Sequence, residues 1–254
     1  MTPGLSASAI VGAWELAEAR GPLDRALLLL WAAGAADEPA ALPLAERDRR
    51  LLALRRASFG DGLACVVDCP ACGAALELEL SSAELADALP AAAPEVIEAG
   101  GARVELRPLD SRDLAAAASL PESDVAGFLR ARACGRETLP EAVAAEVDAR
   151  LEAREALTEL NLSLACAACG AVWRDSLDVG AHVWSEVDQA ARRMMGEAAA
   201  IAAAFGWSEA AILAMSDARR RVYHELARHP ASGRAFVRGS RWPGLSRCPR
   251  MRPK

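Results

Sequence analysis

The sequence predicts an α+β protein that is mostly helical and contains a small zinc-ribbon-like β element. Two observations carry this prediction. The chain holds two Cys-x-x-Cys knuckles, Cys69–Cys72 and Cys166–Cys169, and a glycine follows each of them. Alternating apolar and polar residues flank the knuckles, whereas many of the remaining apolar residues recur at helical spacing.

The residues around each knuckle predict a pair of strands. Ala75–Leu80, after the first knuckle, and Leu160–Leu164, before the second, alternate with the period of a half-buried strand. Leu63–Val67 and Ala171–Leu177 complete the two pairs. Each copy therefore predicts the order strand, knuckle, strand, helix, which is the layout of a zinc ribbon.

Four cysteines form the candidate metal site: Cys69, Cys72, Cys166 and Cys169. Four thiolates are a closed tetrahedral set for structural Zn²⁺ and leave no open position for a catalytic water. The knuckles are roughly a hundred residues apart, whereas about 15–20 is usual in a ribbon. Either one zinc site closes around a helical insertion, or other chains complete two half-sites.

Two other uses of the cysteines are weaker interpretations. A redox Cys-x-x-Cys needs a helix N-terminus, which lowers a thiol pKa, but strands follow these knuckles. Structural disulfides are typical of secreted proteins, and nothing marks this chain as secreted. We interpret Cys65, Cys134 and Cys248 as spare, although Cys65 lies close enough to the first knuckle to substitute as a ligand.

Apolar periodicity and capping residues divide the rest of the chain. Helices are expected over 7–20, 22–34, 44–57, 83–89, 114–120, 121–132, 141–157, 184–205 and 217–227. A short helix is expected to begin at Ser208, and a further strand is expected over 102–109. We therefore predict four segments: an N-terminal helical segment at 1–60, a split zinc ribbon at 61–180 with a helical insertion at about 81–157, a C-terminal helical segment at 181–228, and a flexible basic tail at 229–254. The charged run 46–50 is interpreted as a solvated helix face.

Charge and hydropathy bound the function. The net charge is -6, and from Leu226 onward there are seven arginines and one lysine without an acidic residue, so the body carries about -14. An acidic body argues against general nucleic-acid binding, which usually requires a basic face. The longest apolar stretch, Ala26–Ala36, is shorter than the about 20 residues that span a bilayer. With no signal peptide, we expect a cytoplasmic protein without a membrane span.

The sequence carries no enzyme signature. There are three histidines, none close in sequence to a plausible nucleophile, and neither a phosphate-binding glycine loop nor a Ser-centred elbow is present. We therefore expect a protein that is not an enzyme. An alternative function is a zinc-ribbon regulator that binds DNA through a helix-turn-helix-like hairpin at residues 208–228, with Arg219–Arg221 on the recognition helix.

Three further stretches have a recognisable pattern: Arg47–Gly60, the later knuckle with Val172-Trp173 and Trp184-Ser185-Glu186, and Ala203–Ser216 followed by Arg219-Arg220 and Tyr223. Together they resemble a family of baseplate assembly proteins from contractile-tailed phages and phage-tail-like contractile injection systems. The resemblance covers roughly residues 8–228, and the basic tail departs from the family pattern. It implies a non-catalytic assembly component, or chaperone, of a baseplate or hub, with other baseplate, hub or tail proteins as partners.

Overall fold

The computed structural model describes residues 4–91 and 93–228. The chain divides into two compact units, and the division falls after Ala191, within the long helix α8 (Val179–Phe205). The predicted fold class is confirmed, because the structure is mixed α+β, with 57% helix and 17% strand in small antiparallel sheets. The predicted tail at 229–254 lies outside the described residues, and the division into four segments stays a prediction.

Three helices open the first unit: α1 (Ala7–Ala17), α2 (Pro22–Ala32) and α3 (Leu44–Phe59), with the short 3-10 turn η1 (Pro39–Ala41) before α3. Pro22 occupies the first turn of α2, where its missing N–H costs no helical bond. Gly60 ends α3 with a φ of 98°, which favours glycine. Their buried side chains include Ile10, Leu29, Leu30, Leu51, Leu52 and Leu54.

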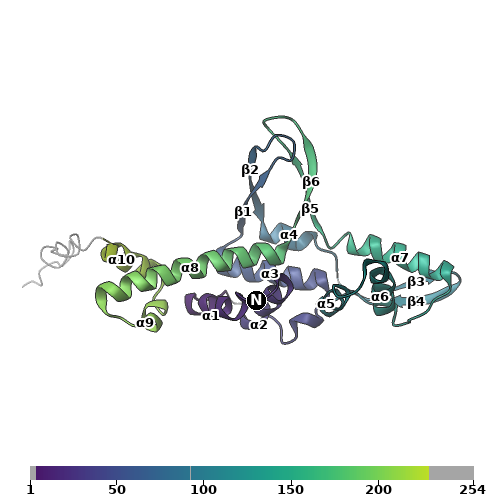
Figure 1. Cartoon of the computed structure of the whole chain (residues 1–254), viewed down its shortest axis with the longest axis horizontal. Helices are drawn as coiled ribbons and strands as arrows, with labels where there is room; N and C mark the ends of the chain where they lie inside the picture. Colours follow the sequence, from purple (N-terminus) through teal and green to yellow (C-terminus); the bar gives the residue numbers. More distant parts are fainter. Residues whose placement is uncertain (1–3, 92, 229–254) are drawn as a thin grey trace, which may run out of the picture. The chain divides into compact units, whose positions relative to one another are not determined.

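Both cysteine knuckles lie in antiparallel hairpins. Strands β1 (Gly62–Asp68) and β2 (Ala75–Ser81) form the first hairpin and lead into α4 (Ser82–Ala88). Strands β5 (Leu160–Ala165) and β6 (Val172–Leu177) form the second and lead into α8. The predicted order of strand, knuckle, strand and helix is confirmed in both copies (Figure 1).

The segment between the hairpins forms its own apolar cluster. This segment contains β3 (Glu95–Ala99), β4 (Ala102–Leu106), α5 (Ser111–Ala117), α6 (Glu122–Cys134) and α7 (Glu141–Glu155). The β4 side chains Val104 and Leu106 pack with Val143, Val147 and Leu151 of α7. The strand expected over 102–109 ends at Leu106, and its partner β3 was not expected, because five residues between a proline and a Gly-Gly turn give too short a pattern.

The second unit holds the end of α8 with α9 (Glu209–Leu213) and α10 (Asp217–Arg228). Its core is Ala198, Ile201 and Ile212, against which Trp207 and Tyr223 pack. The predicted stop at Gly206 and the predicted N-cap at Ser208 are both confirmed: Gly206 has a φ of 71°, and the Ser208 hydroxyl accepts from the Ala211 N–H at 3.3 Å.

No helix in the described part of the chain combines the length and the apolar character needed to cross a bilayer.

Candidate metal centre

The two knuckles have the same backbone conformation. In the first, the Cys69 N–H donates to the Ala74 carbonyl at 2.9 Å, and the Gly73 N–H donates to the Cys69 carbonyl at 2.8 Å. The second knuckle repeats both bonds at 2.9 Å, from Cys166 to Ala171 and from Gly170 to Cys166. Two stretches of different sequence thus form the same tight turn.

A glycine makes each turn possible. Gly73 and Gly170 have φ values of 72° and 76°, in the left-handed region that L side chains rarely adopt. Neither site is crowded, because an added Cβ would meet nothing within 4 Å. The requirement for glycine is therefore conformational, and it places the two cysteines of each knuckle on one side of the turn.

The structure brings all four predicted cysteines together within one chain. Their Sγ atoms lie within 4.8 Å of one another. The Sγ of Cys69 is 3.7 Å from that of Cys169, and the Sγ of Cys72 is 3.7 Å from that of Cys166. Each of these two contacts joins the first cysteine of one knuckle to the second cysteine of the other.

The donor set fits a tetrahedral metal ion. Zn–S bonds of about 2.3 Å in a tetrahedron put neighbouring sulfurs about 3.8 Å apart, close to the 3.7 Å Sγ separations of these two pairs. A disulfide needs about 2.05 Å between sulfurs, so neither close pair is bonded. The cluster can therefore hold a metal ion in a closed, all-sulfur site.

Burial differs in the same way in both knuckles. Cys69 and Cys166, the first cysteines, are buried, whereas Cys72 and Cys169 are exposed. Cys65 and Cys134 are not part of the cluster. Cys65 lies within β1 opposite Leu78, so it is not positioned as a fifth ligand. Cys248 lies outside the described residues.

Without a metal, the pKa values of the Cys166 and Cys72 thiols are shifted in opposite directions. Backbone N–H groups of Cys169 and Ala168 donate to the Cys166 sulfur and, against the effect of burial, lower its pKa to about 7. The Ala74 N–H lowers the pKa of Cys72, but hydrogen bonds with the thiols of Cys169 and Cys69 outweigh it and raise that pKa to about 12. Four thiolates this close repel one another, and a bound cation would remove that penalty.

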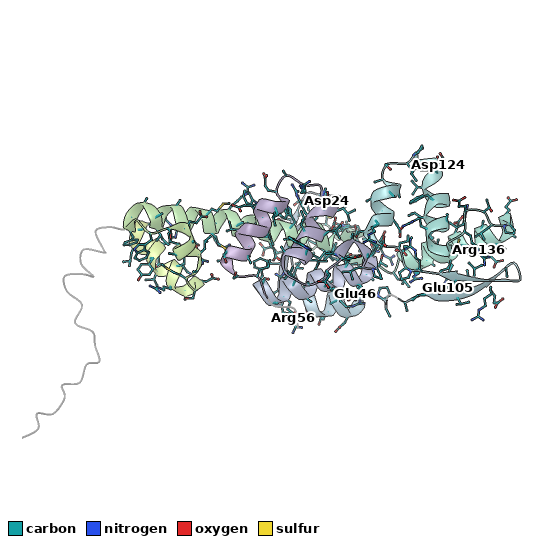
Figure 2. The ribbon with its side chains drawn as sticks, turned by 90° about the horizontal axis from the view of Figure 1, so that it is seen from below. Asp24, Glu46, Arg56, Glu105, Asp124 and Arg136 are labelled. Carbon is teal, nitrogen blue, oxygen red and sulfur yellow. The ribbon has the colours of Figure 1, made fainter. Side chains whose placement is uncertain are left out.

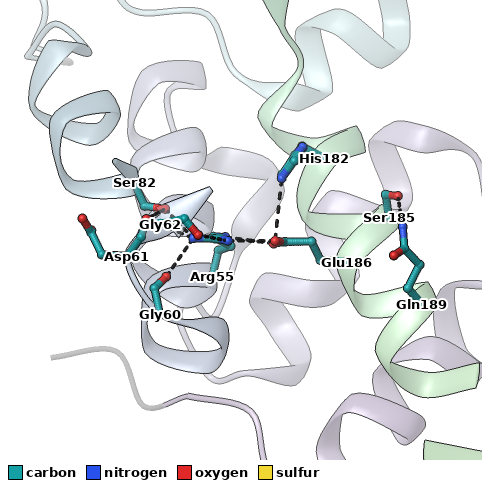
Figure 3. Close-up of polar contacts among 9 residues, drawn as sticks. All are labelled: Arg55, Gly60, Asp61, Gly62, Ser82, His182, Ser185, Glu186 and Gln189. Atoms are coloured by element: carbon teal, nitrogen blue, oxygen red, sulfur yellow. Dashed lines mark hydrogen bonds and ion pairs between the residues drawn. The ribbon is translucent and has the colours of Figure 1, made fainter. Parts of the chain in front are cut away.

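The base of the hairpins is fixed by a buried arginine, Arg55 of α3, which is 3% exposed (Figure 3). Its Nε and Nη2 donate to Glu186 of α8 at 2.9 and 2.8 Å. Nη1 donates to the carbonyls of Gly60 and Asp61 and to the Ser82 hydroxyl, and Nη2 also donates to the Gly62 carbonyl at 2.6 Å. Arg55 therefore connects the first residues of β1 and α4 to the helix that follows β6.

Glu186 is the counter-charge of this network. Burial raises its pKa, but His182 and Arg55 outweigh that effect and lower the pKa to about 2. The His182 Nε2 is 3.8 Å from the Glu186 carboxylate, which is longer than a hydrogen bond, and this buried nitrogen has no hydrogen-bond partner among residues 4–91 and 93–228. The Arg55 contacts are direct hydrogen bonds and dominate the geometry.

The sequence predicted the four cysteines but gave Arg55 no role. One signal was available: Arg55 follows Leu51 by four residues and Leu52 by three, so it shares their core-facing side of α3. A charge on the apolar face of a helix needs a buried partner. Its partner, Glu186, is 131 residues away in the chain, and the sequence alone does not pair them.

The comparisons with known proteins assign no family to this chain. No family model, no curated protein and no solved structure matched it. The function is therefore inferred from the residues and their geometry.

Proposed function

We propose that this protein is a non-catalytic assembly component of the baseplate or hub of a phage tail or contractile injection system, stapled by one structural zinc ion. The observation that carries the proposal is the four-cysteine cluster, which joins two hairpins about a hundred residues apart. A closed set of four sulfurs has no position for substrate or water, so the metal would stabilise the fold and not react.

Zinc is the metal that we propose. Four cysteine sulfurs in a tetrahedron suit zinc or iron–sulfur chemistry. A single Zn²⁺ fits a cluster whose sulfurs all lie within 4.8 Å of one another. Structural zinc contributes on the order of 10–16 kcal/mol to the metal-bound fold of a small domain. That stabilisation would hold the tips of two hairpins that are each only two strands wide.

Residues from all three stretches that resemble the baseplate family make buried or aromatic contacts in the fold, and these contacts support the proposal. Arg55 from the first stretch and Glu186 from the second form the buried ion pair. In the third stretch, Arg220 is 3% exposed and donates to Glu197 at 2.8 Å, and Trp207 and Tyr223 form an edge-to-face pair. The short motifs are thus explained by contacts within the chain.

The test is assembly in the native host. Deleting the gene should abolish assembled contractile particles in electron micrographs, and tagged full-length protein should copurify with baseplate, hub or tail proteins. Complementation with Cys65→Ser should restore particles, whereas complementation with Cys69→Ser should not, because Cys69 belongs to the cluster and Cys65 does not. Normal particles in the deletion strain would refute the proposal.

The alternative of a DNA-binding regulator has less support in the second unit. Arg220, in the middle of the expected recognition helix, is buried and ion-paired with Glu197 and Asp217. The Arg220 guanidinium is therefore not available to contact bases in a DNA groove. Binding to duplex DNA that falls with salt at a slope of about 0.9 per phosphate contacted would favour the regulator instead.

A further inference from the structure

A pocket of about 350 Å³ lies between α6 and α7 in the first unit, and the cluster cysteines do not line it. The two helices pack against each other (Figure 1). The volume falls in the range of ligand pockets, about 300–1,000 Å³. Four apolar and three acidic side chains line the pocket: Leu109, Ala126, Leu129, Leu151, Asp148, Glu152 and Glu155.

Leucines supply most of the apolar lining. Leu109 and Leu151 are buried, and both belong to the apolar cluster of the segment between the hairpins. Leu129 is half-buried and packs against the same cluster. The pocket is therefore an opening in the surface of this cluster, and an apolar side chain that entered it would be removed from water.

The carboxylates give the pocket a negative charge, and none of its described lining residues is cationic. Asp148 is neutralised by an ion pair with Arg130. The carboxylates of Glu152 and Glu155 make no hydrogen bond or ion pair with residues 4–91 and 93–228. Two negative charges at the pocket are therefore left without a partner in contact.

Neighbouring charges do not neutralise Glu155, the less exposed of these two residues. Burial raises its pKa; Arg154 lowers it and Asp113 raises it further, so the two charged neighbours act in opposite directions. The Arg154 guanidinium donates to the backbone carbonyls of Ala93 and Leu106 and not to Glu155. A cation placed at this carboxylate would therefore be favourable.

The C-terminal tail, residues 229–254, has the composition that this lining favours. It contains six arginines, one lysine and no acidic residue, in a chain whose net charge is -6. Arg241 and Trp242 are consecutive, so a cation stands beside the largest apolar side chain. The stretch from His229 to Trp242 spans up to about 50 Å when fully extended, which lets this pair reach well beyond α10.

We propose that the tail docks in this pocket, with the Trp242 ring against the leucines and the Arg241 guanidinium at the carboxylates of Glu152 and Glu155. Arginine suits this position because its planar fork can bind a carboxylate with two parallel hydrogen bonds. The tail of the same chain or of a second copy would present the same residues to the pocket. This docking does not depend on the metal centre or on the proposed assembly function.

The experiment measures how a fluorescent peptide with the sequence of residues 229–254 binds to the full-length protein. In the receptor protein, the six arginines and the lysine of the tail are replaced by glutamine, so that its own tail does not compete. The peptide should bind, and the affinity should fall as salt screens the charges. Glu152→Arg in the receptor should weaken binding about 10-fold, or about 1.4 kcal/mol, because it replaces an attraction with a repulsion.

Two changes in the peptide test the same contacts and leave the receptor unchanged. Trp242→Ala should weaken binding about 10-fold, because the pocket then loses its apolar occupant. Arg241→Glu should weaken binding to the unmodified pocket and bind better to the Glu152→Arg receptor, where the two charges are exchanged.

The matched control is Glu105→Arg, which reverses an exposed charge on β4 outside the pocket lining (Figure 2). It changes the net charge of the receptor as much as Glu152→Arg does, but it should change the affinity less than two-fold, and both receptors should melt alike. Three results would overturn the proposal: no binding of the tail peptide, an equal loss of binding in Glu105→Arg, or equal binding of a peptide with the tail residues in scrambled order. The last result would assign the pocket to basic segments in general.

Discussion

Replacing Arg55 by methionine should cause a large loss of stability in the first unit. The side chain is 3% exposed, and its nitrogens satisfy the Glu186 carboxylate, the Ser82 hydroxyl and three carbonyls between Gly60 and Gly62. Methionine keeps most of the volume but leaves Glu186 charged and without its partner. Breaking a buried ion pair from one side costs about 3–5 kcal/mol.

The neighbouring arginine provides the control. Arg56, labelled in Figure 2, has a side chain that is 59% exposed. It forms an ion pair with Asp61 at 3.2 Å. Arg56→Met should therefore change the free energy of unfolding by less than about 1 kcal/mol, as exposed pairs do. The two variants remove the same charge from adjacent positions of one helix.

Urea unfolding followed by circular dichroism measures both effects. A loss of 3–5 kcal/mol corresponds to a melting temperature lower by roughly 6–20 °C at 2–4 °C per kcal/mol. A second variant, Arg55→Met with Glu186→Leu, should regain part of the loss because it leaves no unpaired buried charge. If Arg55→Met is no less stable than Arg56→Met, the account of how the hairpins are anchored is wrong.

Two further predictions concern the other charged groups. Because the pKa of Glu186 is lowered to about 2, its ionisation stabilises the fold above the unfolded-state pKa near 4.5, and this is lost as the pH falls toward 2. The stability gap between wild type and Glu186→Gln, up to about 3 kcal/mol, should stay constant from pH 7 to 5 and close toward pH 2 in urea titrations; a gap independent of pH would contradict this. In the second unit, Arg220→Ala should increase amide exchange across α10 by removing the pairs with Glu197 and Asp217, whereas Arg221→Ala should not; equal exchange in the two variants would contradict the assigned burial.

The sequence was most informative where a pattern is local. The knuckles, their flanking strands and the stop at Gly206 each occupy a few consecutive residues, and their physical causes lie within those residues. The spacing between the knuckles could not decide whether one chain completes the metal site. In the structure, both hairpins of one chain contribute to the four-cysteine cluster, which could hold a metal ion without a second chain.

The sequence was least informative for pairings between distant charges. The run 46–50 was interpreted as a solvated face, but Arg49 and Arg50 pair with Glu46 and donate to backbone carbonyls of Pro90 and Ala35. These arginines therefore hold loops against α3. An ion pair leaves no periodic trace in a sequence, so such contacts require the fold to be known.

The most direct test of the central claim is the metal content of the purified protein by mass spectrometry, combined with single cysteine substitutions. We predict one zinc ion per chain, its loss with lower melting temperature in variants of any of the four cluster cysteines (Cys69→Ser, Cys72→Ser, Cys166→Ser and Cys169→Ser), and its retention in Cys65→Ser and Cys134→Ser. Protein without bound metal, or equal loss of metal in Cys65→Ser, would contradict the assignment of the four sulfurs as the site that joins the two hairpins.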